Sequence, residues 1–398
     1  MQVAVVGAGP SGTWAAILLA RRGHSVVLID SLAPWEKPCG GGVTAKALSK
    51  FDIFQSDLPR NHIDRMTIYF GDQTSVSIPL QQPVAVLSRR ELTQYLLREA
   101  EKAGVSILKT RITHFESIPS GWRLAARDAT LQSEFLIGAD GATSLVRRFL
   151  GTALQPQDLS VTLGYFIPET VPAHMKIYFL PSFEGYIWSF PRPDHVSYGV
   201  ISRSEPGWTS RAKSLLSNFI LADLGSESLE RAEFYSAPVP CLGPRSWRKN
   251  QISGNRWALV GDAAGLADPI TGEGIYFALK SAQILAETIE RPEEYAVKVW
   301  LEIGLELSRA ARMHKRFYRG RFLGADFKKR LVQFSRRSRT LRKIVGNVMS
   351  GNQSYTSLKK KLFFSIPSIG IDLITGRSEP AERVKGATTP PSSNALSD

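Results

Sequence analysis

Residues Met1–Asp30, which decide the fold of this chain, read MQVAVVGAGPSGTWAAILLARRGHSVVLID. The stretch predicts strand, turn, helix and strand, in that order, over Val3–Val6, Gly7–Gly12, Thr13–Arg22 and Ser25–Ile29. Both strands are short and continuously apolar, which is typical of parallel strands buried on both faces. This order of elements indicates a Rossmann-type α/β unit.

The turn Gly7-Ala8-Gly9-Pro10-Ser11-Gly12 predicts a binding site for a dinucleotide pyrophosphate. Gly7 allows the tight turn, Gly9 lets the backbone approach the phosphates, and Gly12 lets the helix pack closely on the strand. The helix start adds free N–H groups and the positive end of the helix dipole. Asp30 follows about 20 positions on, where a carboxylate can accept hydrogen bonds from a ribose.

Composition limits the class of protein. The 398 residues, 43% of them hydrophobic, can bury a large core and predict two or three domains. The cysteines, Cys39 and Cys241, are too few for a disulfide framework and favour a reducing compartment, which predicts a cytoplasmic protein. The apolar N-terminal residues already form the first strand, so we expect no signal peptide, and no run reaches the ~18 apolar residues of a membrane span. The histidines show no ligand spacing, so we expect no metal.

The stretch Ser31–Thr44 predicts a loop, because its prolines and its three consecutive glycines prevent a regular element. Gly40, Gly41 and Gly42 would let the backbone lie flat against a planar ligand. Cys39 stands next to them, either as a small packing residue or as a thiol close to the reacting face of a bound ring.

Residues 62–86 predict a hairpin that belongs to a second sheet, because two alternating segments flank Gly71-Asp72. An amphipathic helix over Ser88–Ala103 follows. Arg89 opens this helix against the dipole, which indicates either a phosphate or carboxylate partner or a solvated charge.

We call the glycine-rich turn Gly7–Gly12 the first glycine corner. A second glycine corner follows three further predicted strands, over Val105–Leu108, Trp122–Ala126 and Leu131–Ile137. The last strand runs into Gly138-Ala139-Asp140-Gly141, which places a carboxylate where backbone and ligand come close. A short helix begins near Val146.

An aromatic-rich antiparallel sheet is predicted over Leu163–Tyr198. Tyr186, Trp188 and Phe190 alternate along one strand and therefore face the same side. Such aromatics either belong to the core or form the wall of an apolar substrate cavity.

The third corner begins at a buried strand over Arg256–Gly261 and contains Asp262. It continues through Pro269–Gly274 into a helix over Ile275–Ile289. A helix start aimed at a cofactor would stabilise negative charge that develops there.

The net charge of +14 is concentrated late in the chain, where residues 309–361 hold seventeen Lys and Arg against one acid, Asp326. Interleaved apolar residues predict basic amphipathic helices, which suit an anionic membrane surface, a nucleic acid or solvent. No nucleic-acid signature accompanies the charge, so we expect no nucleic acid partner. Leu362–Ile374 is apolar enough to dock on lipid or on the second domain, and Arg377–Asp398 has a disordered composition.

Together the three corners resemble those of FAD-dependent oxidoreductases of the p-hydroxybenzoate hydroxylase type. Lys37–Gly42, Asp268–Gly274 and the Tyr186–Pro191 motif narrow the resemblance to the geranylgeranyl reductase family, whose members saturate prenyl double bonds. It covers roughly residues 1–290. One departure concerns Gly199-Val200-Ile201, where the family's aromatic motif usually continues to Gly-x-Gly.

The resemblance implies roles for individual residues. Those implied to bind FAD are Gly7, Gly9, Pro10, Ser11, Gly12, Asp30, Gly41, Gly42, Arg89, Asp140, Gly141, Gly261, Asp262, Pro269, Gly272, Glu273, Gly274 and Ile275. Cys39, Gly40 and Gly272 would lie at the reacting ring as the catalytic set. Tyr186, Trp188 and Phe190 would line the prenyl cavity, and no metal is implied.

The predicted fold class is α/β, with a discontinuous, GR2-like Rossmann FAD-binding domain, a mixed or antiparallel-sheet substrate domain and a helical C-terminal region. The predicted boundaries are 1–61 with 87–160 and 250–290 for the FAD-binding domain, 62–86 with 161–249 for the substrate domain, 291–376 for the basic helical region and 377–398 for a disordered tail.

The resemblance implies an FAD-dependent reductase acting on a hydrophobic prenyl lipid. Since one dinucleotide fingerprint is present, NAD(P)H or a small redox protein would have to visit the flavin as electron donor. The alternative is an FAD-dependent monooxygenase or halogenase on a hydrophobic or aromatic substrate. A third possibility is a non-catalytic, membrane-associated module that holds FAD as a structural ligand. The basic tail suits peripheral contact with an anionic membrane, and the sequence is silent on oligomeric state.

Overall fold

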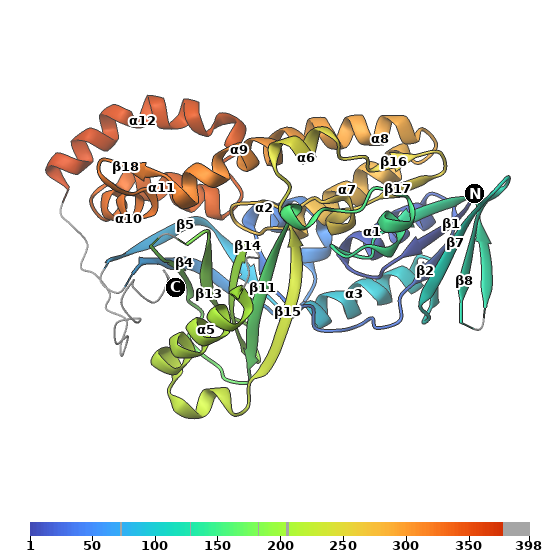
Figure 1. The fold of residues 1–398 in the computed structure, drawn as a ribbon, viewed down its shortest axis with the longest axis horizontal. Helices are drawn as coiled ribbons and strands as arrows, with labels where there is room; N and C mark the ends of the chain where they lie inside the picture. The colour runs from blue at the N-terminus through green and yellow to red at the C-terminus, as the bar shows by residue number, and fades with distance from the viewer. Residues whose placement is uncertain (72–73, 128, 182, 204–206, 377–398) are drawn as a thin grey trace.

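The computed structural model describes residues 1–71, 74–127, 129–181, 183–203 and 207–376. Figure 1 shows an elongated molecule, with a sheet built from the N-terminal strands at one end and the last helices of the chain over the other end. The predicted disordered tail, 377–398, lies outside the described residues.

A six-stranded sheet carries the first corner. Its strand order is β16-β17-β10-β1-β2-β6. The bounds are β1 Gln2–Val6, β2 Ser25–Ile29, β6 Ser106–Leu108, β10 Phe135–Gly138, β16 Ser253–Gly254 and β17 Trp257–Leu259. All neighbours are parallel except β16 and β17. Because both faces of a parallel sheet are covered, its strands are rich in Val, Ile and Leu.

Helices and a small sheet cover this six-stranded sheet. Helices α1 (Pro10–Arg21), α3 (Arg89–Lys102) and α7 (Ile275–Thr288) share one hydrophobic core with it. The three-stranded sheet β7-β8-β9 adds Phe115 and Leu124 to the same core. Its bounds are β7 Ile112–Ile118, β8 Gly121–Ala126 and β9 Thr130–Ser133, and the short helix α4 spans Leu145–Phe149.

An eight-stranded sheet forms the centre of the molecule, in the order β15-β11-β14-β13-β12-β4-β5-β3. Its bounds are β3 Gly42–Val43, β4 Asn61–Phe70, β5 Thr74–Val86, β11 Leu159–Ile167, β12 Met175–Phe179, β13 Gly185–Pro191, β14 Val196–Arg203 and β15 Glu233–Pro240. Neighbouring strands are antiparallel except β4 and β12, which makes the sheet mixed. Helix α5 (Trp208–Leu224) packs on one face around Leu216 and Ile220.

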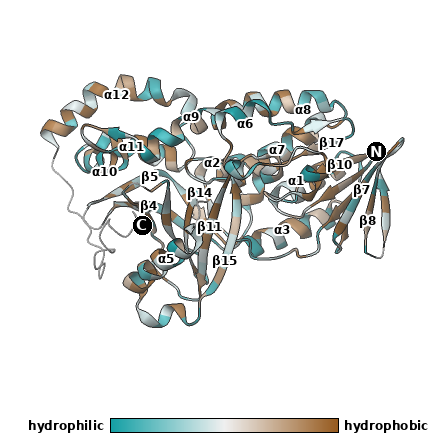
Figure 2. Cartoon of the chain, in the orientation of Figure 1, coloured by the Kyte–Doolittle hydropathy of each residue, from teal (hydrophilic) through white to brown (hydrophobic). Residues whose placement is uncertain are grey.

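The C-terminal helices lie against the eight-stranded sheet near β5, which α10 and α11 contact (Figure 1). Gly346 of α11 is required there, because a Cβ at this position would lie 2.8 Å from the Pro79 carbonyl oxygen. Helix α12 forms the outermost layer, and Figure 2 shows apolar stretches along it. The remaining helix bounds are α2 Ala45–Lys50, α6 Pro244–Arg248, α8 Pro292–Val299, α9 Leu305–Arg319, α10 Phe327–Arg337, α11 Arg339–Met349 and α12 Tyr355–Thr375, and the strands β18 Arg321–Phe322 and β19 Ala325–Asp326 form a small hairpin.

The predicted fold class is confirmed: a Rossmann-type sheet, a mixed sheet and a helical C-terminal region are all present. The domain boundaries given above stay a prediction. Two local expectations were wrong. The single strand expected over Leu131–Ile137 is split into β9 and β10, which belong to different sheets, and β7 was not expected. The expected loop over Ser31–Thr44 also contains the two-residue strand β3.

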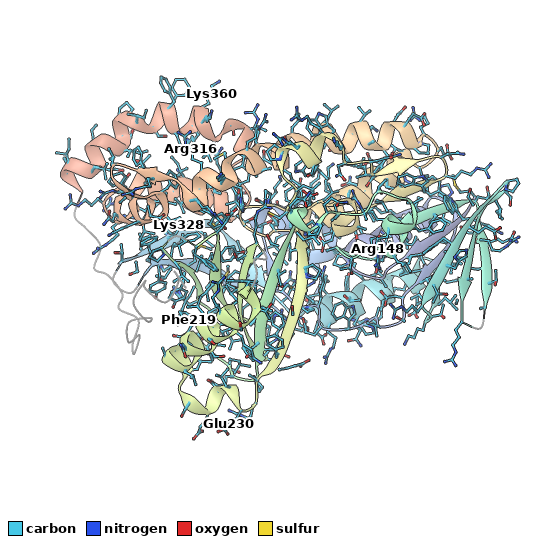
Figure 3. The ribbon with its side chains drawn as sticks, viewed as in Figure 1. Arg148, Phe219, Glu230, Arg316, Lys328 and Lys360 are labelled. Atoms are coloured by element: carbon cyan, nitrogen blue, oxygen red, sulfur yellow. The ribbon has the colours of Figure 1, made fainter. Side chains whose placement is uncertain are left out.

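A buried lysine joins the C-terminal helices to the eight-stranded sheet. Lys328 of α10 is fully buried, and its Nζ donates to the carbonyl oxygens of Leu180, Phe183 and Tyr318 at 3.1, 2.8 and 2.7 Å. Figure 3 shows its position between the last helices and the sheet. Burial lowers the pKa of this ammonium, while Asp326, at 3.6 Å, opposes the shift.

We predict that Lys328→Met lowers the free energy of unfolding by about 3 kcal/mol, because buried carbonyl groups lose a charged donor. Urea denaturation followed by circular dichroism measures this change. Lys329→Met is the matched control, since Lys329 is exposed on the same helix and should change stability by less than about 0.5 kcal/mol. Equal stabilities for the two variants would contradict the assigned role of Lys328.

Candidate active site

The three glycine corners meet at one edge of the six-stranded sheet. Strands β17, β10 and β1 are parallel neighbours, and each runs directly into one corner. The corners are tied to one another through the backbone, because the Ala139 N–H donates to the Val6 carbonyl at 2.8 Å and the Val260 N–H donates to that of Gly138 at 2.9 Å. The carboxyl edge of an open parallel sheet is where such folds bind ligands.

The first corner is packed too tightly for side chains at two positions. Gly7 has a φ of +104°, and a Cβ there would lie 2.4 Å from the Ala139 carbonyl oxygen. A Cβ on Gly12 would lie 1.9 Å from the Gly7 carbonyl oxygen. Gly9 is uncrowded and begins α1 without a side-chain cap, which leaves the N–H groups of the first turn available to an anion.

The acidic residues of the three corners differ in what they bind. Asp30 accepts hydrogen bonds from the N–H groups of Ala8, Leu32 and Ala33, and so fixes the first corner. Asp140 accepts from the N–H groups of Leu145 and Val146 at the start of α4, and burial raises its pKa.

The third acid, Asp262, differs because its carboxylate reaches a cavity. It pairs with the ammonium of Lys37 at 2.7 Å, and both residues line that cavity.

A buried ion pair holds the loop that carries Cys39. Glu36 accepts hydrogen bonds from the N–H groups of Arg89 and Arg90 at 2.8 and 3.2 Å and pairs with Arg192. Burial alone would raise the pKa of Glu36, but Arg192 and these donors lower it. Arg192 is fully buried and also donates to the Cys39 carbonyl oxygen, so a strand-end arginine of the second sheet fixes this loop.

Arg89 provides a test of whether an anionic cofactor fits. Its side chain is 6% exposed and lines the cavity. Its Nη1 lies 3.4 Å from Cys39 Sγ, while its buried Nε has no hydrogen-bond partner among the described residues. A buried cation with an unused donor needs an anion, which a nucleotide phosphate supplies. This burial excludes the alternative of a solvated charge for Arg89, and the residues present fit a dinucleotide.

Aromatic side chains form one wall of the cavity. Tyr186, Trp188 and Phe190 all line it, as their alternation on β13 predicted. A Cβ on Gly40 would lie 2.3 Å from the Phe190 ring, so the loop backbone lies directly on this ring. Tyr186 donates through its hydroxyl to the Thr271 carbonyl oxygen, which ties the aromatic wall to the third corner.

The cavity continues into an apolar arm that the sequence did not predict. Counted together with its open mouth, the empty space of the cavity is about 1450 Å³. The arm is lined by Met66 and Val84 of β4 and β5, Met175 and Ile177 of β12, and Val348 and Met349 of α11. These residues come from segments far apart in the chain, and no local motif marks them.

A half-buried carboxyl group, that of Glu273, lies in the same cavity. Glu273 Oε1 accepts a hydrogen bond from Thr44 Oγ1 at 2.6 Å. Burial raises the pKa of Glu273 to about 7; Asp268 acts in the same direction, while Thr44 and Lys46 oppose the shift. This carboxyl group is therefore able to hold and release a proton near neutral pH.

The structure brings most of the predicted site residues to this cavity. The lining includes Cys39, Gly40 and Gly272 of the catalytic set, the aromatic wall, and Gly9, Pro10, Ser11, Gly41, Gly42, Arg89, Gly141, Asp262, Glu273, Gly274 and Ile275 of the cofactor set. The predicted cofactor residues outside the lining are Gly7, Gly12, Asp30, Asp140, Gly261 and Pro269. Their roles toward FAD, like those of the lining residues, stay predictions.

Known proteins match both the sequence and the fold. The FAD binding domain family matches residues 1–294. A digeranylgeranylglycerophospholipid reductase of Methanothrix thermoacetophila is 30% identical over 309 residues, covering 72% of this chain and 77% of that protein. A chloroplastic geranylgeranyl diphosphate reductase of Arabidopsis thaliana is 27% identical over 317 residues, covering 73% of this chain and 65% of the plant protein.

A solved structure shares the fold. The geranylgeranyl bacteriochlorophyll reductase-like protein of Thermoplasma acidophilum superposes with a TM-score of 0.74 at 24% identity, covering 91% of this chain and 98% of that one. The predicted Rossmann-type FAD-binding fold and the FAD cofactor are confirmed by these matches.

We predict that Arg89→Met weakens FAD binding by about 10- to 100-fold, because the buried guanidinium could then no longer donate to a cofactor phosphate. Quenching of flavin fluorescence on titration of the apoprotein measures the affinity. Arg90→Met is the matched control, since Arg90 is the next residue and is exposed. If Arg89→Met keeps its circular dichroism spectrum and binds FAD like the control, the assignment of Arg89 is wrong.

Proposed function

The chain belongs to the geranylgeranyl reductase family of FAD-dependent oxidoreductases, and on that premise we propose that it reduces carbon–carbon double bonds of a prenyl lipid. The observation that carries the proposal is the continuity of one cavity. The lining of this one cavity includes residues of the glycine corners, Cys39, the aromatic wall and the apolar arm. A nucleotide-binding edge that opens into a methionine- and aliphatic-lined arm suits an oxidoreductase with a long hydrocarbon substrate.

The arm would hold the prenyl chain without hydrogen bonds. Met66, Met175 and Met349 are unbranched and polarizable, so they adapt to a flexible branched hydrocarbon. Tyr186 and Phe190 pack against the cluster that contains Met66 and Met175, so their rings extend the apolar surface of the arm. Burial of the hydrocarbon would contribute about 0.8 kcal/mol per CH₂ group, which favours long prenyl chains over short ones.

Saturation of an alkene adds a hydride to one carbon and a proton to the other. Bound FAD, once reduced, supplies the hydride. The protein's residues would position the double bond. Gly40 and Gly272 carry no side chains and would allow close approach at the cavity wall, and Cys39 belongs to the same lining. An isolated alkene is a poor hydride acceptor, so this positioning matters for the rate.

We infer that Glu273 supplies the proton. It is the lining carboxyl group whose pKa burial raises to about 7, and its Oε1 is oriented by Thr44. A protonated carboxyl group at this place can donate to the substrate carbon that does not receive the hydride. Asp262, the other acid in the lining, is paired with Lys37 and is suited to holding the cofactor.

The sequence indicates how the electron donor would reach the flavin. One dinucleotide fingerprint, Gly7–Gly12, occurs in the chain, and FAD would occupy it. NAD(P)H or a small redox protein would therefore visit the cavity only transiently to reduce the flavin.

The alternative is an FAD-dependent monooxygenase or halogenase. Halogenation in this fold class would call for a free lysine ammonium in the cavity. Lys37 is the one lysine in the cavity lining as far as the chain is described, and its ammonium is paired with Asp262. This pairing favours reduction.

The reaction is tested with purified holoprotein, reduced by dithionite without oxygen and mixed with geranylgeranyl diphosphate or a geranylgeranylated glycerophospholipid. We expect products heavier by one H₂ for each double bond reduced, as measured by mass spectrometry. The same protein, reduced and then exposed to air and substrate, should give no hydroxylated or halogenated product. Oxygen or halide incorporation without hydrogenation would favour the alternative.

We predict that Glu273→Gln lowers the single-turnover rate of reduction by about 10²- to 10⁴-fold, because the amide cannot donate the proton. The wild-type rate should fall as the pH rises through about 7, where the carboxyl group of Glu273 loses its proton. The residual rate of the variant should lack this dependence.

Thr44→Val is the matched control. The substitution removes the Thr44 hydroxyl, whose hydrogen bond lowers the pKa of Glu273. The midpoint of the pH profile should therefore move to higher pH, while the rate at low pH is retained. A full rate in Glu273→Gln, or an unmoved midpoint in Thr44→Val, would exclude Glu273 as the proton donor.

A further inference from the structure

The outermost helix, α12, has two apolar faces. Its inner face packs on the protein. Leu358 belongs to a hydrophobic cluster with Ile270 and Ile344, and Leu362 and Ile369 pack against this cluster. These positions recur at helical spacing along the whole element. Within the described residues, the inner face thus packs on Ile270 and on helices α9 and α11, and not on the second domain, which was one of the two docking surfaces expected for Leu362–Ile374.

The outer face of α12 is apolar and open to solvent. Figure 1 shows α12 at the edge of the molecule, with no layer of the described chain outside it. The exposed fractions on this face are 68% for Phe363, 67% for Phe364, 60% for Ile366, 62% for Ile371 and 87% for Ile374. Five large apolar side chains within three to four turns form a contiguous patch, which marks an interaction surface.

Positive charge borders this patch on one side. Lys359, Lys360 and Lys361 are exposed on the turn before Phe363, and Figure 3 shows Lys360 pointing away from the molecule. The single acid of α12, Asp372, accepts hydrogen bonds from Ser338 Oγ and the Thr340 N–H at 2.8 and 2.9 Å, and so faces the protein. The exposed surface of α12 is thus cationic at its start and apolar over the rest.

We propose that the outer face of α12 is the surface by which this protein docks on an anionic lipid bilayer. The aromatic and aliphatic side chains would enter the boundary between headgroups and acyl chains, and the three lysines would meet the anionic headgroups. The apolar part, Phe363–Ile374, is about 18 Å long, too short to span the hydrocarbon core of about 30 Å, so the helix would lie in the plane of the interface. Among the described residues, no helix is long and apolar enough to cross a bilayer.

A second copy of the chain fits this face less well. A pairing of two α12 helices would bring their lysines into a desolvated contact, and α12 presents no outward acid to neutralise them. Lipid headgroups supply that negative charge over the whole interface.

Docking through α12 would be mechanically connected to the active site. The hydroxyl of Tyr355, the first residue of α12, lies 3.0 Å from Asp268 Oδ2, and its N–H donates to Glu306 of α9. Asp268 in turn holds the loop of Thr271 and Gly272, which line the cavity. The first residue of the helix that would meet the lipid is therefore hydrogen-bonded to Asp268, which holds the loop that lines the cavity.

The experiment is flotation of the full-length holoprotein with vesicles, which requires no turnover and is independent of the proposed reaction. Vesicles of phosphatidylcholine with phosphatidylglycerol are compared with vesicles of phosphatidylcholine alone. We expect strong binding to the anionic vesicles that weakens at high salt, and weak binding to the neutral ones.

Phe363→Ser with Phe364→Ser should lower the partition coefficient on anionic vesicles at least about tenfold. The matched control is Val297→Ser with Leu301→Ser, which removes two apolar side chains of similar exposure, 58% and 59%, away from α12. The control should bind like the wild type.

The charge is tested by Lys359→Gln with Lys360→Gln, which should weaken anionic binding about fivefold per lysine. Lys329→Gln with Lys343→Gln, two exposed lysines of α10 and α11, is the matched control and should have a smaller effect. Equal binding to neutral and anionic vesicles, or equal loss in the α12 variants and their controls, would overturn the proposal. Sedimentation velocity without vesicles is the last measurement: a dimer that Phe363→Ser with Phe364→Ser dissociates would assign the face to a second copy instead.

Discussion

The close contact between the first two glycine corners is the constraint on which the rest of the structure depends. The carbonyl of Ala139 occupies the space where a side chain of Gly7 would be, and the carbonyl of Gly7 occupies the space beside Gly12. This contact sets the distance between β1, β10 and α1, because the backbone atoms touch directly. This edge of the sheet, where the glycine corners meet, can form only because Gly7 and Gly12 have no side chains. A Cβ at either position would force the strands and the helix apart.

The second constraint joins the two sheets. Arg192, at the end of β13, is fully buried and pairs with Glu36, which also begins α3 by accepting N–H groups. One ion pair thus fixes a strand end of the central sheet, a helix start of the FAD-binding part and the loop of Cys39. A buried pair of this kind adds little net stability, but it specifies a single arrangement, since separating the two charges would leave both without a partner.

The parts of the site that lie within one continuous segment could be predicted from the sequence. Contacts between segments far apart in the chain could not. The glycine corners could be located because each is a strand, a turn and a helix in uninterrupted order. The alternation of Tyr186, Trp188 and Phe190 predicted that their side chains face the same side of the sheet, since side chains of a strand alternate between its two faces. The partners of these segments could not be deduced. Glu36 and Arg192 stand far apart in the chain, and nothing local distinguishes them from surface charges. Met66, Met175 and Met349 meet only because β4 pairs with β12 and α11 packs on β5.

The same limit explains the errors in the strand assignments. Leu131–Ile137 has the apolar content of one strand, but the chain changes sheets at Glu134, whose N–H donates to the Gln2 carbonyl oxygen. The surroundings of Glu273 could not be predicted either, because its neighbours Gly272 and Gly274 indicate a loop and do not show which residues pack around it. Long-range packing, which no window of the sequence contains, decides both cases.

The strand order also has a consequence for how the protein is made. In the six-stranded sheet the neighbours β1, β10 and β17 are contributed by residues near 5, 137 and 258. A nascent chain leaving the ribosome has its first nucleotide corner long before the third exists, and β4 waits for β12 in the same way. Such nonlocal pairing slows folding and leaves strand edges uncovered for as long as translation lasts. Overproduction of this protein should therefore benefit from slow synthesis and from chaperones that shield β1 and β4 until the last strands arrive.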